Sequence, residues 1–155
     1  MKAPANARVE VKRCASAGGF TLVEVMVTIV IVAILAALAY PNYTDYIRRG
    51  HVQEAPATLM AYRARLEQFY QDHRSYASGS ACGVAVPAAP AVEYFSYACT
   101  TTNGGQGYTA TATGVGGTVA GLGYSIDQAN TRTSTCSGCA WNFGTVPDAW
   151  VLQRP

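Results

Sequence analysis

The sequence predicts an α+β fold in which a long N-terminal helix precedes a small antiparallel β-sheet. An apolar run from Phe20 to Tyr40 contains a single charge, Glu24, which indicates a helix able to enter a membrane. A helical, amphipathic pattern then continues to about residue 75. From residue 93 onward, short alternating segments rich in aromatic and β-branched residues indicate strands.

The apolar run is the first element, and its one carboxylate needs an explanation. A helix of 21 residues is about 31 Å long, which is enough to cross the hydrocarbon core of a bilayer. A carboxylate in such a helix costs roughly 2.5–3.5 kcal/mol on insertion scales. Glu24 is therefore a candidate functional residue that requires a positively charged partner, unless the run is an ordinary signal anchor with an accidental charge.

A basic leader of 19 residues precedes the apolar run and ends in Gly18 and Gly19. A secretory signal peptide places its small-residue cleavage site after the apolar region, whereas here the two glycines come before it. A cut after Gly19 would keep the apolar helix and create an amino group on Phe20, about one helical turn from Glu24. The basic leader predicts a cytoplasmic N-terminus and an exported remainder.

The charge balance gives no sign of nucleic-acid binding. The whole chain has 11 basic and 9 acidic residues, but the leader holds four of the basic ones and one of the acidic ones. Residues 20–155 therefore carry 7 basic against 8 acidic residues. Their length suits one compact domain and a membrane anchor.

Residues 41–75 are expected to continue the helix with one face toward a core. That face carries apolar residues at spacings of three and four: Val52, Ala55, Leu59, Tyr62, Leu66, Phe69 and Tyr70. Pro41 removes a backbone donor and predicts a kink or a loosened turn at the start of this segment. Gly50 and Pro56 are expected to weaken the helix locally.

Residues 76–155 are expected to form a head domain with about four strands. Segments 93–101 and 107–113 pair around a turn at 103–105, and segments 124–127 and 131–134 pair around a turn at 128–130. Residues 78–90 predict an irregular loop, and the tail from residue 135 is expected to close over the sheet edge.

Four cysteines follow the leader, namely Cys82, Cys99, Cys136 and Cys139. An even number in an exported domain predicts two disulfides, and of the three possible connectivities we favour the local one, Cys82–Cys99 with Cys136–Cys139. The Cys136-Ser137-Gly138-Cys139 motif lacks the βαβ setting of a redox dithiol, and a zinc site would want two close pairs. We therefore expect no catalytic residue, no metal and no cofactor.

The junction Gly19-Phe20-Thr21-Leu22-Val23-Glu24 resembles the leader junction of type IV pilins, the prokaryotic N-terminal methylation motif. The resemblance implies that a prepilin peptidase cuts after Gly19 and methylates Phe20. It also implies that Glu24 neutralises the terminal amine of an adjacent subunit during assembly. Pilins also carry a proline at the distance of Pro41, where the surrounding helix can unwind in the filament.

Later segments resemble PilE-type minor pilins: the helix end at residues 63–76, the strand at 94–101, and the hairpins at 103–114 and 123–135. The resemblance implies a type IV pilin fold and a minor pilin that enters or primes a pilus. It implies a leader at residues 1–19, a membrane and filament-core helix at 20–40, an amphipathic continuation at 41–75 and a head at 76–155. The precursor would sit in the inner membrane with its head in the periplasm, and the mature subunit would be extracellular.

The implied partners are the prepilin peptidase, the major pilin, other minor pilins, the inner-membrane assembly machinery and the membrane itself. A DNA-receptor pilin for natural transformation is an alternative. We do not favour DNA, because Arg132 and Arg154 are the only basic residues after Arg74. A type II secretion pseudopilin is the other alternative, since it would share the leader and Glu24.

Overall fold

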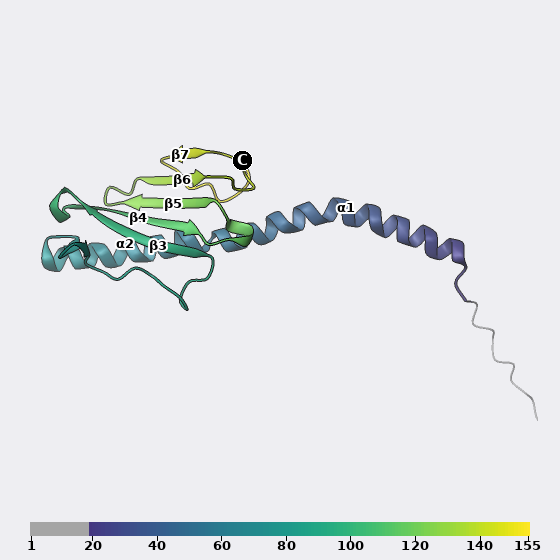
Figure 1. The fold of residues 1–155 in the computed structure, drawn as a ribbon, viewed down its shortest axis with the longest axis horizontal. Helices are drawn as coiled ribbons and strands as arrows, with labels where there is room; N and C mark the ends of the chain where they lie inside the picture. The colour runs from purple at the N-terminus through teal and green to yellow at the C-terminus, as the bar shows by residue number, and fades with distance from the viewer. Residues whose placement is uncertain (1–18) are drawn as a thin grey trace, which may run out of the picture. The chain divides into compact units, whose positions relative to one another are not determined.

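The structure of this chain is a computed structural model that describes residues 19–155 (Figure 1). The predicted leader, apart from Gly19, lies outside the described residues. The described chain belongs to two compact units, of which the first ends at Leu38 and the second comprises Ala39–Pro155. Each unit is considered by itself below.

Two helices account for the N-terminal half of the described chain. Helix α1 covers Leu22–Val52 and contains Pro41, and helix α2 covers Glu54–His73. They are separated only at Gln53, whose N–H bonds to the carbonyl of Gly50 at 3.3 Å. Helix α2 is followed by its C-cap, Arg74, which adopts a left-handed conformation with φ 53° and donates its N–H to the carbonyl of Tyr70. The predicted weak point near Gly50 and Pro56 thus coincides with the break between the helices.

The head is built on an antiparallel five-stranded sheet with the order β3-β4-β5-β6-β7, so that each strand pairs with its sequence neighbour. The strands are β3 (Phe95–Thr102), β4 (Gly107–Gly114), β5 (Leu122–Asp127), β6 (Arg132–Cys136) and β7 (Thr145–Pro147). Short 3₁₀ turns, η1 (Asn103–Gly105) and η2 (Gly117–Val119), follow β3 and β4. Figure 1 shows α2 running beneath this sheet.

The head has more strands than we expected from the sequence. Strand β7 comes from the tail, and a two-residue pair, β1 (Ala77–Ser78) with β2 (Ala81–Cys82), begins just before the loop expected at 78–90 and extends into it. These segments are too short to show an alternating pattern, and β7 contains a proline. Their positions are fixed by backbone bonds to distant segments, such as Tyr76 N–H to the Gly105 carbonyl at 2.7 Å, which sequence periodicity does not report.

The core lies between α2 and the inner face of the sheet. The apolar helix face predicted over residues 52–70 is buried in its first part. Val52 at the end of α1 is fully buried, and so are Ala55, Leu59, Tyr62 and Leu66 of α2. Phe69 and Tyr70, at the end of this face, are only half-buried. Alternate residues of the central strands complete the core: Tyr108, Ala110 and Ala112 from β4, and Leu122, Tyr124 and Ile126 from β5.

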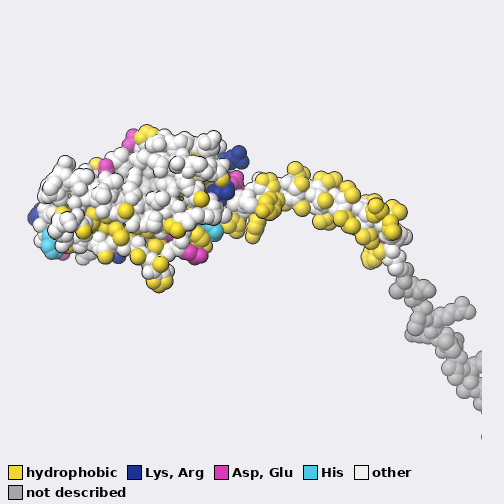
Figure 2. All heavy atoms as spheres, in the orientation of Figure 1, with side chains coloured by type: hydrophobic (Ala, Val, Ile, Leu, Met, Phe, Trp, Pro, Cys, Tyr) yellow, Lys and Arg dark blue, Asp and Glu magenta, His cyan; other side chains and the backbone are white. Residues whose placement is uncertain are grey.

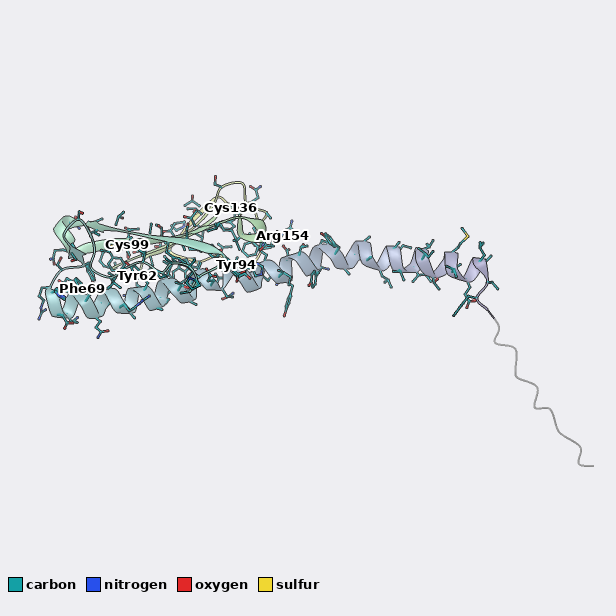
Figure 3. The ribbon with its side chains drawn as sticks, turned by 60° about the horizontal axis from the view of Figure 1, so that its bottom comes forward. Tyr62, Phe69, Tyr94, Cys99, Cys136 and Arg154 are labelled. Carbon is teal, nitrogen blue, oxygen red and sulfur yellow. A yellow bond between two sulfur atoms is a disulfide. The ribbon has the colours of Figure 1, made fainter. Side chains whose placement is uncertain are left out.

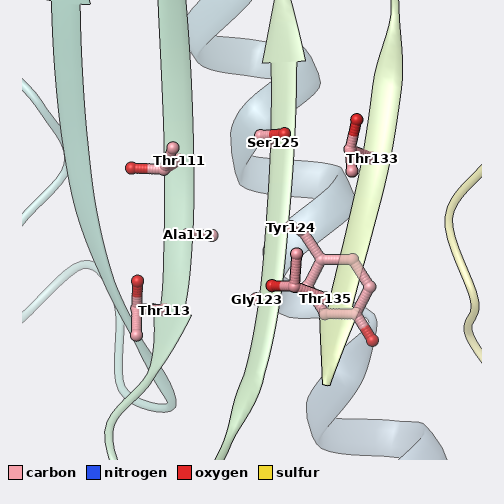
Figure 4. Close-up of a pocket in the computed structure, with 8 residues that line it drawn as sticks. All are labelled: Thr111, Ala112, Thr113, Gly123, Tyr124, Ser125, Thr133 and Thr135. Carbon is pink, nitrogen blue, oxygen red and sulfur yellow. The ribbon is translucent and has the colours of Figure 1, made fainter. Parts of the chain in front are cut away.

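The opposite face of the sheet is lined by hydroxyl side chains. Gly123 lies between Thr113 and Thr135 across the strands, which leaves a shallow hollow of about 250 Å³ (Figure 4). The residues around this hollow are Thr111, Ala112, Thr113, Gly123, Tyr124, Ser125, Thr133 and Thr135. None of them is a histidine, a cysteine or a carboxylate, so the hollow offers neither an acid–base pair nor a metal ligand set.

Candidate functional site

The N-terminal segment displays the predicted processing residues at the start of a helix. Phe20 is 83% exposed, and α1 begins two residues later at Leu22. The Thr21 hydroxyl accepts the N–H of Glu24 at 3.2 Å, which caps the helix in the manner of a Thr-x-x-Glu start. Glu24 is exposed and forms no ion pair with any residue from 19 onward. Its carboxylate is therefore available to a cation from another molecule.

The rest of the first unit is an apolar helical surface. Residues 22–38 are all exposed, and Val23, Met26, Val27, Val30 and Ile31 line a shallow hollow among themselves. Figure 2 shows hydrophobic side chains along this part of the helix. The helix is long and apolar enough to cross a membrane by length and composition. The Thr28 hydroxyl bonds to the carbonyl of Val25 at 2.8 Å, so it presents no free donor to an apolar environment.

Pro41 lies inside α1, at the start of the second unit. The Thr44 hydroxyl donates to the Pro41 carbonyl at 2.9 Å. Helix α1 continues through Pro41, so the kink expected there stays a prediction.

The end of α1 is tied to the head by polar contacts that the sequence did not reveal. Arg48 donates to the carbonyl of Thr118 at 2.7 Å and pairs with Asp45. His51 bonds to the Thr118 hydroxyl at 2.7 Å and stacks on Tyr94 with 3.9 Å between ring centroids. The sequence gives no sign of this environment of His51, because Thr118 and Tyr94 are brought to it from far along the chain.

Glu54, at the first turn of α2, binds the backbone where β3 begins. Its carboxylate accepts the N–H groups of Glu93, Tyr94 and Phe95 at 2.9–3.3 Å. Charge-assisted bonds of this kind are stronger than neutral ones. Glu54 therefore links the connecting loop, the sheet edge and the helix at a single point.

Two disulfides join the head segments in the local connectivity favoured from the sequence. Cys82 pairs with Cys99 across β2 and β3, with 6.1 Å between their Cα atoms. Cys136 pairs with Cys139 in the loop after β6, with 5.3 Å between Cα atoms. Figure 3 labels Cys99 and Cys136 on different parts of the head. Within residues 19–155 no group of three His, Cys, Asp or Glu side chains is arranged to hold a metal ion.

A polar cluster beneath the sheet surrounds the fully buried Tyr108. The Tyr76 hydroxyl donates to Glu67 at 2.9 Å, and Glu67 lies 3.8 Å from Arg63. Burial and the Glu67 carboxylate together raise the pKa of Tyr76 to about 12. Burial, with the same carboxylate, raises the pKa of Tyr108 further. Both tyrosines stay neutral at physiological pH; Tyr76 donates to Glu67, whereas the buried Tyr108 hydroxyl has no hydrogen-bond partner among the described residues.

Two arginines from different elements lie at the turn between β5 and β6. Arg63 of α2 reaches Asn130 of this turn at 3.2 Å, and Arg132 begins β6 on the other side of it. The Arg132 guanidinium lies 4.9 Å above the ring of Trp150, and its buried Nε has no partner among the described residues. Counting basic residues along the head sequence missed this arrangement, because Arg63 belongs to the helix.

The sequence matches two known protein families. Residues 41–122, just over half of the chain, match the family described as type IV minor pilin ComP, DNA uptake sequence receptor. The chain belongs to this family of type IV minor pilins. Residues 14–40 match the prokaryotic N-terminal methylation motif, which contains Gly19, Phe20 and Glu24. The resemblance to type IV pilins drawn from the sequence is thereby confirmed.

Curated relatives of this minor pilin are themselves pilins. The chain is 37% identical over 86 residues to the type IV major pilin protein PilE1 of Neisseria gonorrhoeae, covering 56% of this chain and 40% of that one. It is 43% identical over 61 residues to a fimbrial protein of Moraxella nonliquefaciens, covering 39% and 40%. The matches thus span about two fifths of the length of these relatives.

A type IV pilin from Shewanella oneidensis is similar in structure, with a TM-score of 0.42 and 18% identity. The match covers 55% of this chain and 89% of that one.

Proposed function

We propose that this chain is a minor subunit of a type IV pilus, made as a membrane-anchored precursor and cut between Gly19 and Phe20. The observation that carries the proposal is Glu24, a single unpaired carboxylate on a helix whose other exposed side chains from 22 to 38 carry no charge. In an apolar filament core this carboxylate is tolerable only when it pairs with a cation. The amine created at Phe20 of a neighbouring subunit supplies that cation.

The roles of the parts follow from this proposal. The prepilin peptidase removes residues 1–19 and methylates Phe20, and the apolar helix then exchanges lipid for the helices of the major pilin and other minor pilins. Pro41 gives the helix a site where it can loosen during this exchange. The precursor holds its head on the periplasmic side, and assembly exposes the head, stabilised by its two disulfides, on the surface of the pilus.

The test is quantitative mass spectrometry of filaments sheared from the cell surface, reading the N-terminal peptide and the ratio of this chain to the main pilin. A methylated Phe20 peptide at low stoichiometry supports a processed minor pilin. Processed protein that stays in the envelope and is missing from sheared filaments would instead support a type II secretion pseudopilin. A peptide that retains the leader would contradict the processing step.

A second function, DNA reception at the pilus surface, is favoured by the name of the matched family, DNA uptake sequence receptor. The arginines at the β5–β6 turn give it a candidate contact. Arg63 and Arg132 flank Asn130, and these side chains together can reach a phosphate and a base edge. Residues 76–155 carry two arginines against three carboxylates, and Arg63 of the helix, which lies 3.8 Å from Glu67, adds a further cation at this turn.

This second function is tested with the full chain in detergent and a labelled DNA duplex. Arg132→Ala and Arg63→Ala should each weaken binding and reduce the slope of log affinity against log salt by about 1. Arg65→Ala is the matched control, because Arg65 is an exposed arginine on the same helix. Equal loss in all three variants would indicate nonspecific attraction, and no loss at positions 63 and 132 would exclude the turn as the contact.

A further inference from the structure

The first turns of the second unit carry large aromatic side chains that the described protein leaves uncovered. Tyr40, Tyr43 and Tyr46 are 73%, 64% and 73% exposed, although they belong to the unit that contains the head. A tyrosine has an apolar ring and a polar hydroxyl, so it is suited to a boundary between an apolar and an aqueous phase. Three such residues within two helical turns indicate that this surface lies at a boundary of that kind.

Their place in the chain identifies that environment. The apolar run ends at Tyr40, which is the first of the three tyrosines. From Tyr40 to Tyr46 the helix rises about 9 Å, close to the roughly 5–8 Å thickness of the headgroup layer of one leaflet. Tyrosine and tryptophan are enriched at this depth in membrane proteins.

The charged residues at this end of the head favour an anionic surface. Arg48 is occupied by Asp45 and Thr118, whereas the neighbouring Arg49 is exposed and forms no ion pair with a described residue. Arg154 is likewise exposed, and Figure 3 places it at the same end of the head as Tyr94.

The remaining neighbours leave room for a headgroup. Tyr46, Ile47, Arg49, Gly50 and His51 line a hollow of about 430 Å³ on this surface. The Glu54 carboxylate is occupied by backbone N–H groups. The exposed Glu93 beside Tyr94 reduces the positive charge of this end but does not cancel two arginines.

We propose that an interfacial collar, made of Tyr40, Tyr43, Tyr46, Arg49 and Arg154, rests on anionic phospholipid headgroups while the precursor is held in the membrane. The tyrosines fix the depth of the helix, and the arginines hold the end of the head against the headgroups. This inference rests on the membrane-anchored precursor of the proposed function. It adds that the head is docked on the lipid before assembly and must be released from it.

The first experiment measures depth. The full chain, labelled with 3-fluorotyrosine and with ¹³C-methyl methionine, is placed in nanodiscs of phosphatidylcholine and phosphatidylglycerol. Spin labels are attached either to lipid headgroups or to acyl-chain ends. Headgroup labels should broaden the signals of Tyr40, Tyr43 and Tyr46, assigned by single Tyr→Phe variants, at least about threefold more than those of the buried Tyr108 and Tyr124.

The methionine signals separate failure of the collar from failure of the anchored precursor. Acyl-chain labels should broaden Met26 of the apolar run and leave Met60 of α2 unchanged. Broadening of Met26 without broadening of the three tyrosines overturns the collar alone and favours neighbouring subunits as the partner of these residues. An unaffected Met26 overturns the anchored precursor as well.

The second experiment measures how much the charges of Arg49 and Arg154 contribute to docking of the head. Headgroup-label broadening of Tyr94 reports docking of the head, and Arg49→Glu or Arg154→Glu should each reduce the docked population about fivefold in anionic nanodiscs. Arg65→Glu is the matched control, since it makes the same charge change on α2. Nanodiscs of phosphatidylcholine alone should remove the difference between variants. Equal broadening in every variant would overturn the role of the arginines.

Discussion

At the scale of single residues, Glu54 shows how one carboxylate can fix the boundary between a loop and a strand. Glu54→Gln keeps the size of the side chain but removes the charge that strengthens three backbone bonds to residues 93–95. We expect a loss of about 1.5–3 kcal/mol in the free energy of unfolding of the head, measured by denaturant titration of the full chain in detergent.

Asp72→Asn is the control for Glu54→Gln, because Asp72 is an exposed carboxylate on the same helix. It should change stability by less than about 0.5 kcal/mol. Equal stability of the two variants would mean that the backbone N–H groups at residues 93–95 find water as easily as they find Glu54.

Tyr76 and the half-buried Tyr97 predict that the head loses stability at alkaline pH. The pKa values of Tyr76 and Tyr97 are raised from 10.0 to about 12, mainly because burial disfavours the charged tyrosinate. Since the folded state keeps its protons where the unfolded chain loses them, this contribution is complete below pH 10 and is lost as the pH rises toward 12. Tyrosinate absorbance should therefore rise together with loss of near-ultraviolet circular dichroism. Ionisation of these residues without unfolding would contradict the prediction.

At the scale of elements, two glycines predict opposite effects of alanine. A Cβ at Gly114, where β4 ends, would lie 2.0 Å from the carbonyl oxygen of Val119, so Gly114→Ala must displace backbone. A Cβ at Gly50 of α1 would meet nothing within 4 Å, so Gly50→Ala should stabilise that helix by about 0.5–1 kcal/mol. Thermal unfolding should place Gly114→Ala below the unaltered chain and Gly50→Ala above it. A reversed order would contradict both arguments.

The disulfides predict unequal effects of removal. Cys82 and Cys99 are 17 residues apart. Joining them lowers the entropy of the unfolded chain, which stabilises the folded state by about 3 kcal/mol. Cys136 and Cys139 are 3 apart and close a much smaller loop. Paired Cys→Ser variants, compared by denaturant titration, should show the larger loss for Cys82 and Cys99. Equal losses would indicate that the shorter bridge also orders the C-terminal tail.

The same elements show how far the sequence could predict the fold and the site. The apolar face of α2 follows from a period of 3.6 residues, and the β3–β4 and β5–β6 hairpins follow from a period of 2. Both periods persist over enough residues to be recognised. Strand β7 and the β1–β2 pair have two or three residues each, and only tertiary bonds fix them. The contact of His51 with Tyr94 and that of Arg63 with Asn130 join residues far apart in sequence, and no periodic pattern encodes them.

At the scale of the whole molecule, the proposed cleavage before Phe20 and the carboxylate of Glu24 would act together. A single uncompensated charge in the apolar core of an assembly costs about 3–5 kcal/mol, and a pair of opposite charges avoids most of that cost. Because Glu24 has no cation among the described residues, its partner must come from outside them, and the amine at position 20 of an adjacent subunit has the right charge. Processing would thus create the group that assembly requires.

This argument predicts that charge at position 24, rather than size, decides assembly. Glu24→Gln should leave insertion and cleavage intact but lower the ratio of filament to envelope protein about tenfold or more, while Glu24→Asp should retain part of that ratio. Mass spectrometry of sheared filaments and of membranes measures both, and Thr28→Ser on the same helix is the control. Gln and Glu variants that enter filaments equally would show that helix packing alone drives insertion and that the carboxylate serves the peptidase instead.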